Sequence, residues 1–256
     1  MLTAIIVAAG GSQRMGFDKL FATIGGKPLL AHTLHAFERT GSVNEIIVVA
    51  REDRHDGIRK INHAENLKKV RSIITGGERR QDSVRAGLNH LNIDAKYVAV
   101  HDAARPLISP EQIERVFEQC AIHGAAALAE PINDTLKRGD IDPTGTRSLN
   151  SGQAEQVIVV TGSVDRHQLY AMQTPQVFER ALIEEAYRAA ETKNLSLTDE
   201  VSAVEQFGRK VVLVPNDDFN FKITYPRDLA LGEFVLKQRA RSDRTGQAPT
   251  ETNPRN

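Results

Sequence analysis

IIVAAGGSQRMGFDK, residues 5–19, is the stretch of the sequence that decides the fold. Its first three residues are apolar and β-branched, which predicts a short strand buried on both faces. The loop that follows is built from small residues, namely Gly10, Gly11, Ser12 and Gly16. Small residues let the backbone approach a ligand and point amide N–H groups at an anion. Because Arg14 and Lys19 add two positive charges, the stretch predicts a strand that leads into a polyphosphate-binding loop.

The spacing of these glycines excludes two common phosphate-binding loops. Residues 5–19 contain neither the G-x-G-x-x-G of dinucleotide-binding folds nor a G-x-x-x-x-G-K followed by Ser or Thr. The first absence counts against a nicotinamide-dependent oxidoreductase. A loop that serves only as a structural turn stays open as the alternative.

Length and charge restrict the classes of protein to consider. The chain has 256 residues, with 33 Lys and Arg against 33 Asp and Glu. This length fits one α/β domain, which we expect over residues 1–238, followed by a disordered tail over residues 239–256 that lacks apolar periodicity. A formal net charge of zero gives no general attraction for nucleic acid or an anionic membrane, so we expect neither as a partner. Any anion site must be local.

The single cysteine, Cys120, rules out a disulfide within the chain. Its place in an apolar helical pattern predicts a buried structural thiol and fits the reducing cytoplasm. The N-terminal apolar run has no preceding basic segment and is too short to cross a bilayer, so we expect neither a signal peptide nor a membrane span.

Apolar runs alternate with helical patterns along the chain. Strands are predicted over residues 46–50, 70–74, 97–100, 125–129, 211–214 and 221–224. Helices are predicted over residues 28–37, 83–91, 110–123, 179–191, 200 onward and 226–236. The alternation predicts an α/β fold with a mostly parallel, twisted sheet flanked by helices.

Residues 133–163 interrupt this alternation. They carry several glycines and a proline but no helical stripe, and they end near an apolar run, VIVV, at residues 157–160. We interpret the segment as a projecting β arm whose apolar ribbon is poorly buried in a monomer, which suggests a contact between subunits. A long surface loop packed on its own domain is the alternative.

Charged residues in or beside the predicted loops supply the candidate chemistry. The basic ones are Arg14, Lys19, Arg105, Arg166 and Lys222. Asp102 follows a predicted strand, at the edge where open α/β sheets bind ligands. No nucleophilic triad or metal-ligand cluster has a recognisable spacing, so positioning and charge stabilisation remain, and these suffice when one phosphate attacks another. Such a reaction requires Mg²⁺, for which Asp102 is the candidate ligand.

Eight motifs resemble, in order, the 2-C-methyl-D-erythritol 4-phosphate cytidylyltransferases of the non-mevalonate isoprenoid pathway. They are AAGGSQRMGFDK (8–19), GGERRQDSV (76–84), VHDAARP (100–106), PINDTLKR (131–138), VDR (164–166), QTPQVF (173–178), TDEVSAVE (198–205) and FKITYPRDLALGE (221–233). The resemblance implies a Rossmann-like nucleotidyltransferase fold, a homodimer joined by the arm, and cytidylyl transfer from CTP to methylerythritol phosphate with release of pyrophosphate.

The resemblance also implies roles for individual residues. As catalytic residues it implies Arg14, Lys19, Arg166 and Lys222. As nucleotide-binding residues it implies Ala8, Ala9, Gly10, Gly77, Glu78, Ser83 and Asp102, with Glu78 standing where the family usually has aspartate. As residues that bind the second substrate it implies Asp102, Arg105, Thr135, Arg166, Thr174 and Lys222, with Thr135 and Arg166 reaching the neighbouring subunit's site.

Two further functions remain open on the sequence. A ribitol 5-phosphate cytidylyltransferase has similar motifs and differs in the alcohol that it accepts. A noncatalytic nucleotide-binding module could keep the same fold, but it would not need to hold an attacking phosphate.

Overall fold

A computed structural model of the chain describes residues 1–11, 13–148 and 154–245. Ser12 of the predicted phosphate loop and residues 246–256 of the predicted tail lie outside the described residues. The chain divides into two compact units, one formed by Met1–Ala129 with Met172–Asn256 and the other by Glu130–Ala171.

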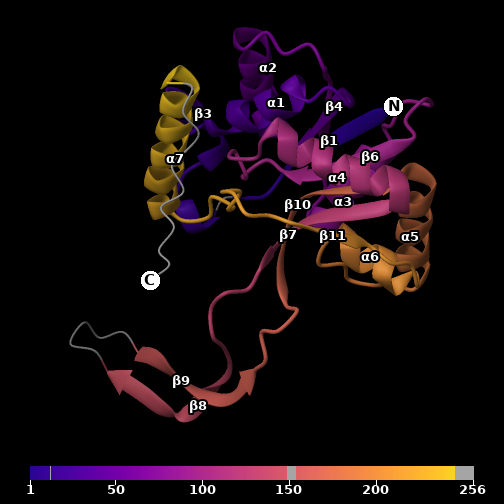
Figure 1. The fold of residues 1–256 in the computed structure, drawn as a ribbon. Helices are drawn as coiled ribbons and strands as arrows, with labels where there is room; N and C mark the ends of the chain where they lie inside the picture. Colours follow the sequence, from indigo (N-terminus) through magenta and orange to yellow (C-terminus); the bar gives the residue numbers. More distant parts are fainter. Residues whose placement is uncertain (12, 149–153, 246–256) are drawn as a thin grey trace. The chain divides into compact units, whose positions relative to one another are not determined.

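A sheet that has seven strands within the described residues forms the centre of the first unit (Figure 1). Its strands are β1 (Leu2–Ala8), β4 (Val43–Ala50), β5 (Val70–Thr75), β6 (Tyr97–Asp102), β7 (Ala125–Pro131), β10 (Tyr170–Glu179) and β11 (Val212–Pro215). They lie in the order β11-β7-β10-β6-β1-β4-β5, so that β1 and β6 are neighbours although far apart in sequence. β10 pairs antiparallel with β6, whereas β1 pairs parallel with both β4 and β6. The predicted α/β class with a mostly parallel sheet is confirmed.

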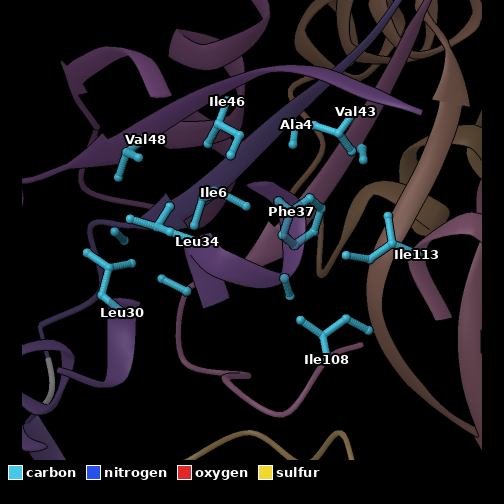
Figure 2. Packing of buried hydrophobic residues seen from close by; sticks show 14 of the residues in the cluster. Ala4, Ile6, Leu30, Leu34, Phe37, Val43, Ile46, Val48, Ile108 and Ile113 are labelled. Atoms are coloured by element: carbon cyan, nitrogen blue, oxygen red, sulfur yellow. The ribbon is translucent and has the colours of Figure 1, made fainter. Parts of the chain in front are cut away.

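Helices cover both faces of this sheet because β1 is apolar on both. The helices are α1 (Leu29–Arg39), α2 (His55–Ala64), α3 (Arg80–Leu88), α4 (Pro110–His123), α5 (Arg180–Thr192), α6 (Glu200–Gln206) and α7 (Pro226–Thr245). Ile6 packs in one cluster with Leu34 and Phe37 of α1 (Figure 2). Ile5 points to the other face and packs in a second cluster with Val84 of α3. Each fully buried side chain of this size contributes about 1.5–3 kcal/mol, so β1 is anchored from both sides.

Helix α4 shows how local sequence sets an element's ends. Ser109 Oγ accepts a hydrogen bond from Gln112 N at 3.2 Å, and Gln112 Oε1 accepts one from Ser109 N at 2.9 Å. Gly124 ends the helix with a left-handed φ of 83°. The predicted helix over residues 110–123 is confirmed at both ends.

The second unit is built around a two-stranded antiparallel ribbon, β8 (Leu136–Ser148) and β9 (Ala154–Val164). A ribbon therefore replaces the surface loop considered as the alternative. Ile141, Ile158 and Val160 are 56%, 69% and 67% exposed in the single chain. Apolar side chains this open on a ribbon mark a surface suited to association.

Residues 221–224 do not form the predicted strand. The backbone amides of Thr224 and Tyr225 both donate to Asp228 Oδ2, at 2.7 and 2.8 Å, so they serve the first turn of α7 instead of a neighbouring strand. The β-branched and aromatic residues of this segment matched a strand pattern, but its hydrogen bonds decide against one.

Helix α7 is longer than predicted. It continues to Thr245, so the predicted helix end at residue 236 and the predicted disordered tail are wrong for residues 239–245. Arg239 explains part of the extension, because its guanidinium donates to Leu107 O at 2.6 Å and to Asp218 Oδ2 at 2.7 Å.

Candidate active site

A buried arginine holds both ends of the loop after β1. Arg54, with a side chain 2% exposed, pairs with Asp18 Oδ2 at 2.6 Å and also donates to Ala8 O. Asp18 in turn caps the short 3₁₀ helix Lys19–Phe21 by accepting from Leu20 N. The end of β1 and the start of the segment that carries Lys19 are therefore held by one guanidinium.

Two glycines let a second segment come close to this loop. A Cβ on Gly76 would lie 2.6 Å from Ser83 Oγ and 2.9 Å from Ala9 Cβ. A Cβ on Gly77 would lie 2.4 Å from Asp82 Cβ. Only glycine fits at these positions without movement of the neighbours, so the turn between β5 and α3 can pack against the loop after β1.

A pocket of about 490 Å³ lies where the carboxyl ends of β1, β5 and β6 meet. This is the edge at which open parallel sheets bind ligands. Of the residues predicted from the sequence, those that line the pocket are Ala8, Ala9, Gly10, Arg14, Lys19, Gly77, Glu78, Ser83, Asp102 and Lys222. Residues contributed by four separate stretches of the chain are thus brought together.

Asp102 is the anionic centre of the pocket. Lys222 Nζ donates to Asp102 Oδ2 at 2.9 Å, Arg80 Nε donates to Oδ1 at 3.2 Å, and Arg105 Nε lies 3.8 Å from Oδ2. Burial acts to raise the pKa of the Asp102 carboxyl, but the charges of Arg80, Lys222 and Arg105 outweigh burial and hold that pKa below its usual range. Asp102 is therefore ionised and aligns the cations around it.

Lys19 is fixed by a backbone oxygen. Its Nζ donates to Ile223 O at 2.6 Å, one residue beyond Lys222. Burial, followed by the charges of Lys222 and Arg14, lowers the pKa of Lys19. Three cations crowded in one pocket leave a local positive potential that an incoming polyphosphate relieves.

A buried network behind the pocket was missed by the sequence reasoning. Arg80 Nη1 donates to Glu200 Oε1 and Oε2 at 2.6 and 2.8 Å, and Tyr187 Oη donates to Glu200 Oε1 at 3.0 Å. Burial raises the pKa of the 1%-exposed Glu200. Burial acts to lower the pKa of Arg80, but the charges of Glu200 and Asp102 outweigh it and raise that pKa.

Arg80 also lines the pocket and links this network to Asp102. The sequence signal that could have found Arg80 is its place at the start of a helix that follows a strand. The predicted helix over residues 83–91 begins instead at Arg80. Glu200 was seen only as part of a helix start, and nothing local in the sequence pairs it with a residue 120 positions away.

Two predicted residues lie beside the pocket and not on its lining. Arg105 donates to Asn220 O at 2.8 Å and to Met172 O at 3.4 Å, which fixes the backbone that leads to Lys222. Thr174 Oγ1 accepts from Asp102 N at 3.0 Å and lies 3.1 Å from His101 Nδ1. Burial lowers the pKa of His101 to about 3, so this histidine is neutral and supplies no charge. Contact of Arg105 and Thr174 with a substrate stays a prediction.

Thr135 and Arg166 belong to the second unit. Thr135 is exposed, and the Arg166 guanidinium donates to Asn133 O. The two residues thus lie in the strand-flanking parts of the ribbon unit, with a role that stays a prediction.

The pocket offers few ligands for a metal ion. Within the described residues there is no group of three or more His, Cys, Asp or Glu side chains that could hold one. Asp102 and Glu78 are both on the lining. Mg²⁺ in nucleotide enzymes keeps several waters and needs only one or two carboxylates besides phosphate oxygens, so the ionised Asp102 fits such a role.

Comparison with known proteins points to one family. The sequence profile of the family described as 2-C-methyl-D-erythritol 4-phosphate cytidylyltransferase matches residues 2–238. A protein of that name from Halalkalibacterium halodurans is 37% identical over 241 residues, which cover 93% of this chain and 98% of the relative. Another from Dehalococcoides mccartyi is 38% identical over 236 residues, covering 92% and 96%.

Solved structures agree. The 4-diphosphocytidyl-2C-methyl-D-erythritol synthase of Anaerococcus prevotii superposes with a TM-score of 0.76 at 29% identity, covering 93% of this chain and 96% of that one. The 2-C-methyl-D-erythritol 4-phosphate cytidylyltransferase of Thermus thermophilus gives a TM-score of 0.70 at 29% identity, covering 91% and 98%.

Proposed function

This chain belongs to the family of 2-C-methyl-D-erythritol 4-phosphate cytidylyltransferases, and we propose how its pocket carries out their reaction. The enzyme transfers a cytidylyl group from CTP to 2-C-methyl-D-erythritol 4-phosphate, which gives 4-diphosphocytidyl-2-C-methyl-D-erythritol and pyrophosphate in the non-mevalonate route to isoprenoid precursors. The observation that carries the assignment to this pocket is that Arg14, Lys19 and Lys222 line it together with Asp102.

The reaction needs charge and alignment more than it needs a base. A phosphate oxygen of the alcohol substrate attacks the α-phosphorus of CTP, a new P–O bond forms, and the bond to the bridging oxygen breaks, so that pyrophosphate leaves with its electron pair. Because the attacking oxygen is already ionised at neutral pH, the protein has to align it and neutralise the crowded phosphorus centre.

The pocket cations divide this work. Arg14 and Lys19 neutralise charge at the α-phosphate, and Lys222 orients the attacking phosphate. Asp102 holds Lys222, and Ile223 O holds Lys19, so both ammonium groups are aligned before substrate arrives. Such preorganisation avoids a reorganisation cost during the reaction.

The nucleotide lies along the two loops that the glycines bring together. The backbone of Ala8, Ala9 and Gly10 surrounds the nucleotide, while the segment with Gly77, Glu78 and Ser83 recognises cytosine; all six line the pocket. Asp102 would hold Mg²⁺, and the ion would supply positive charge to the phosphate groups.

A coupled assay for pyrophosphate tests the function. We expect release when the protein is mixed with CTP, Mg²⁺ and methylerythritol phosphate, and none when EDTA replaces the metal. Absence of release at high protein concentration would refute catalysis and leave a noncatalytic nucleotide-binding module. Faster turnover on ribitol 5-phosphate than on methylerythritol phosphate would reassign the alcohol substrate.

The ribbon unit supports the proposal of a homodimer. Its exposed apolar residues, such as Ile158 and Val160, form a surface that a second copy of the chain would cover. In that dimer Thr135 and Arg166 contact the methylerythritol phosphate bound in the neighbouring subunit's pocket.

We expect Arg166→Ala to raise KM for methylerythritol phosphate and to change KM for CTP little, because the guanidinium grips only the alcohol phosphate. Mixing this variant with Lys19→Ala under conditions that exchange subunits should restore activity above that of either variant alone. Each hybrid then combines the Lys19 of one subunit with the Arg166 of the other in one complete site. Steady-state kinetics before and after mixing check both points; no gain on mixing contradicts sharing of the site.

A cytoplasmic location is also part of the proposal. Cys120, the single cysteine, is free and buried, which fits a reducing compartment. Across the described residues, no helix combines the length and the apolar character needed to span a bilayer.

A further inference from the structure

Arg14 is held in an unusual way for a pocket cation. Its guanidinium carbon lies 5.4 Å from the centroid of the Tyr225 ring, within the range of a cation–π contact. Among the described residues the Arg14 side chain makes no hydrogen bond and no ion pair. The ring is therefore the group that sets where this charge points.

The backbone around Arg14 does not fix the side chain by itself. Arg14 lies on a single 3₁₀ turn, Gln13–Met15, followed at once by Gly16 with a left-handed φ of 71°. A Cβ on Gly10 or Gly16 would meet nothing within 4 Å, so the loop is not packed closely at either position. A long flexible side chain on such a loop needs an outside contact to keep one direction.

Tyr225, in contrast, is held firmly at the start of α7. Its backbone N–H donates to Asp228 Oδ2 at 2.8 Å, and the residue as a whole is 42% exposed. Three residues earlier Lys222 binds Asp102, and two residues earlier Ile223 O accepts from Lys19. One short segment thus carries Lys222 itself, the backbone oxygen that holds Lys19 and the ring that contacts Arg14.

We propose that Tyr225 is a positioning residue that holds the Arg14 guanidinium at the pocket in readiness for the triphosphate. This inference rests on the proposed function, because it assigns Arg14 to the α-phosphate. The ring supplies a flat, weakly polar platform that orients the charge without neutralising it, unlike a carboxylate, so the charge stays available to phosphate oxygens.

Arg227 provides an internal control. Its guanidinium carbon lies 5.3 Å from the centroid of the same ring, yet its side chain is 84% exposed and does not line the pocket. Loss of Arg227 removes a charge from the ring while the Arg14 contact stays in place.

The kinetic test compares five variants, with Arg14→Ala as the reference for a double variant. Tyr225→Ala should lower kcat by about three- to fivefold, the size of an exposed cation–π contact, with a smaller change in KM for CTP. Tyr225→Phe should retain most of the wild-type kcat, since it keeps the ring. Arg227→Ala should leave kcat unchanged. Tyr225→Ala added to Arg14→Ala should cause no further loss. A further loss in that double variant, or an equal loss in Tyr225→Phe, would overturn the proposal.

A second measurement does not depend on catalysis. The chain contains no tryptophan, so Tyr225→Trp introduces a single indole whose emission reports on the stacked guanidinium. We expect the emission to differ between this variant and Tyr225→Trp with Arg14→Ala, and CTP to change it only when Arg14 is present. Identical spectra in the two backgrounds would overturn the proposal, whereas wild-type protein without pyrophosphate release would refute the proposed function alone.

Discussion

Lys19→Ala is expected to lower kcat by about a hundred- to a thousandfold, the range for loss of one preorganised group that stabilises charge in the transition state. KM for CTP should change much less, because the charge that Lys19 neutralises grows mainly as the α-phosphate is attacked. Lys19 Nζ is fixed on Ile223 O inside the pocket, and alanine leaves no ammonium group at that position. Steady-state kinetics with saturating methylerythritol phosphate measure both constants.

Lys60→Ala is the matched control, because Lys60 is an exposed lysine on α2 away from the pocket lining. It should behave as wild type. If Lys19→Ala weakened CTP binding by as much as it lowered kcat, Lys19 would be an ordinary phosphate anchor and not a group that acts in the transition state.

Arg80→Met is expected to destabilise the protein by about 3–5 kcal/mol, the cost of removing one partner from a buried ion pair. Glu200 is 1% exposed, and among the described residues its carboxylate would keep only the hydrogen bond from Tyr187. Asp102 would lose one of its cations. Urea unfolding followed by circular dichroism measures the change. Arg59→Met, which breaks an exposed pair with Asp56 on α2, should cost no more than about 0.5 kcal/mol.

The stability that Arg80→Met loses should increase as pH rises. Burial already raises the pKa of Glu200, and removal of Arg80 takes away the charge that opposes this effect. A carboxyl whose pKa is higher in the folded than in the unfolded protein favours folding at low pH and loses that contribution as pH rises through its folded pKa. Arg80→Met should thus be closest to wild type near the ordinary glutamate pKa of about 4.3 and furthest from it at neutral pH. Adding Glu200→Gln should recover stability at neutral pH; no recovery would show that the buried charge is not the cause.

The sequence predicts well those parts of the fold that depend on neighbours along the chain. The apolar run of β1 and the Ser109–Gln112 start of α4 are local signals, and both elements form where expected. The roles of the loop residues were predicted instead from the eight ordered motifs. The pocket brings Arg14, Lys19, Asp102 and Lys222 together.

What could not be predicted depends on partners distant in sequence. The pairing of Arg80 with Glu200 joins two helices whose residues look like ordinary surface and cap positions in isolation. Residues 221–224 have the composition of a strand. Their backbone amides instead donate hydrogen bonds to the Asp228 carboxylate and to Ala104 O, and in the described part of the chain they form no strand. The polar end of α7 shows no apolar stripe, and its contact through Arg239 to Leu107 O becomes visible only in three dimensions.

The tight glycine turn after β5 also bears on how resistance to an inhibitor could arise. A compound that rests on the pocket wall at Gly77 would be hard to evade by mutation of Gly77 or of the adjacent Gly76, since any side chain there would collide with Ser83, Ala9 or Asp82. The substitutions that block such a drug would deform the same segment for which we propose recognition of cytosine. Escape would have to come from other positions, or from increased production of the target.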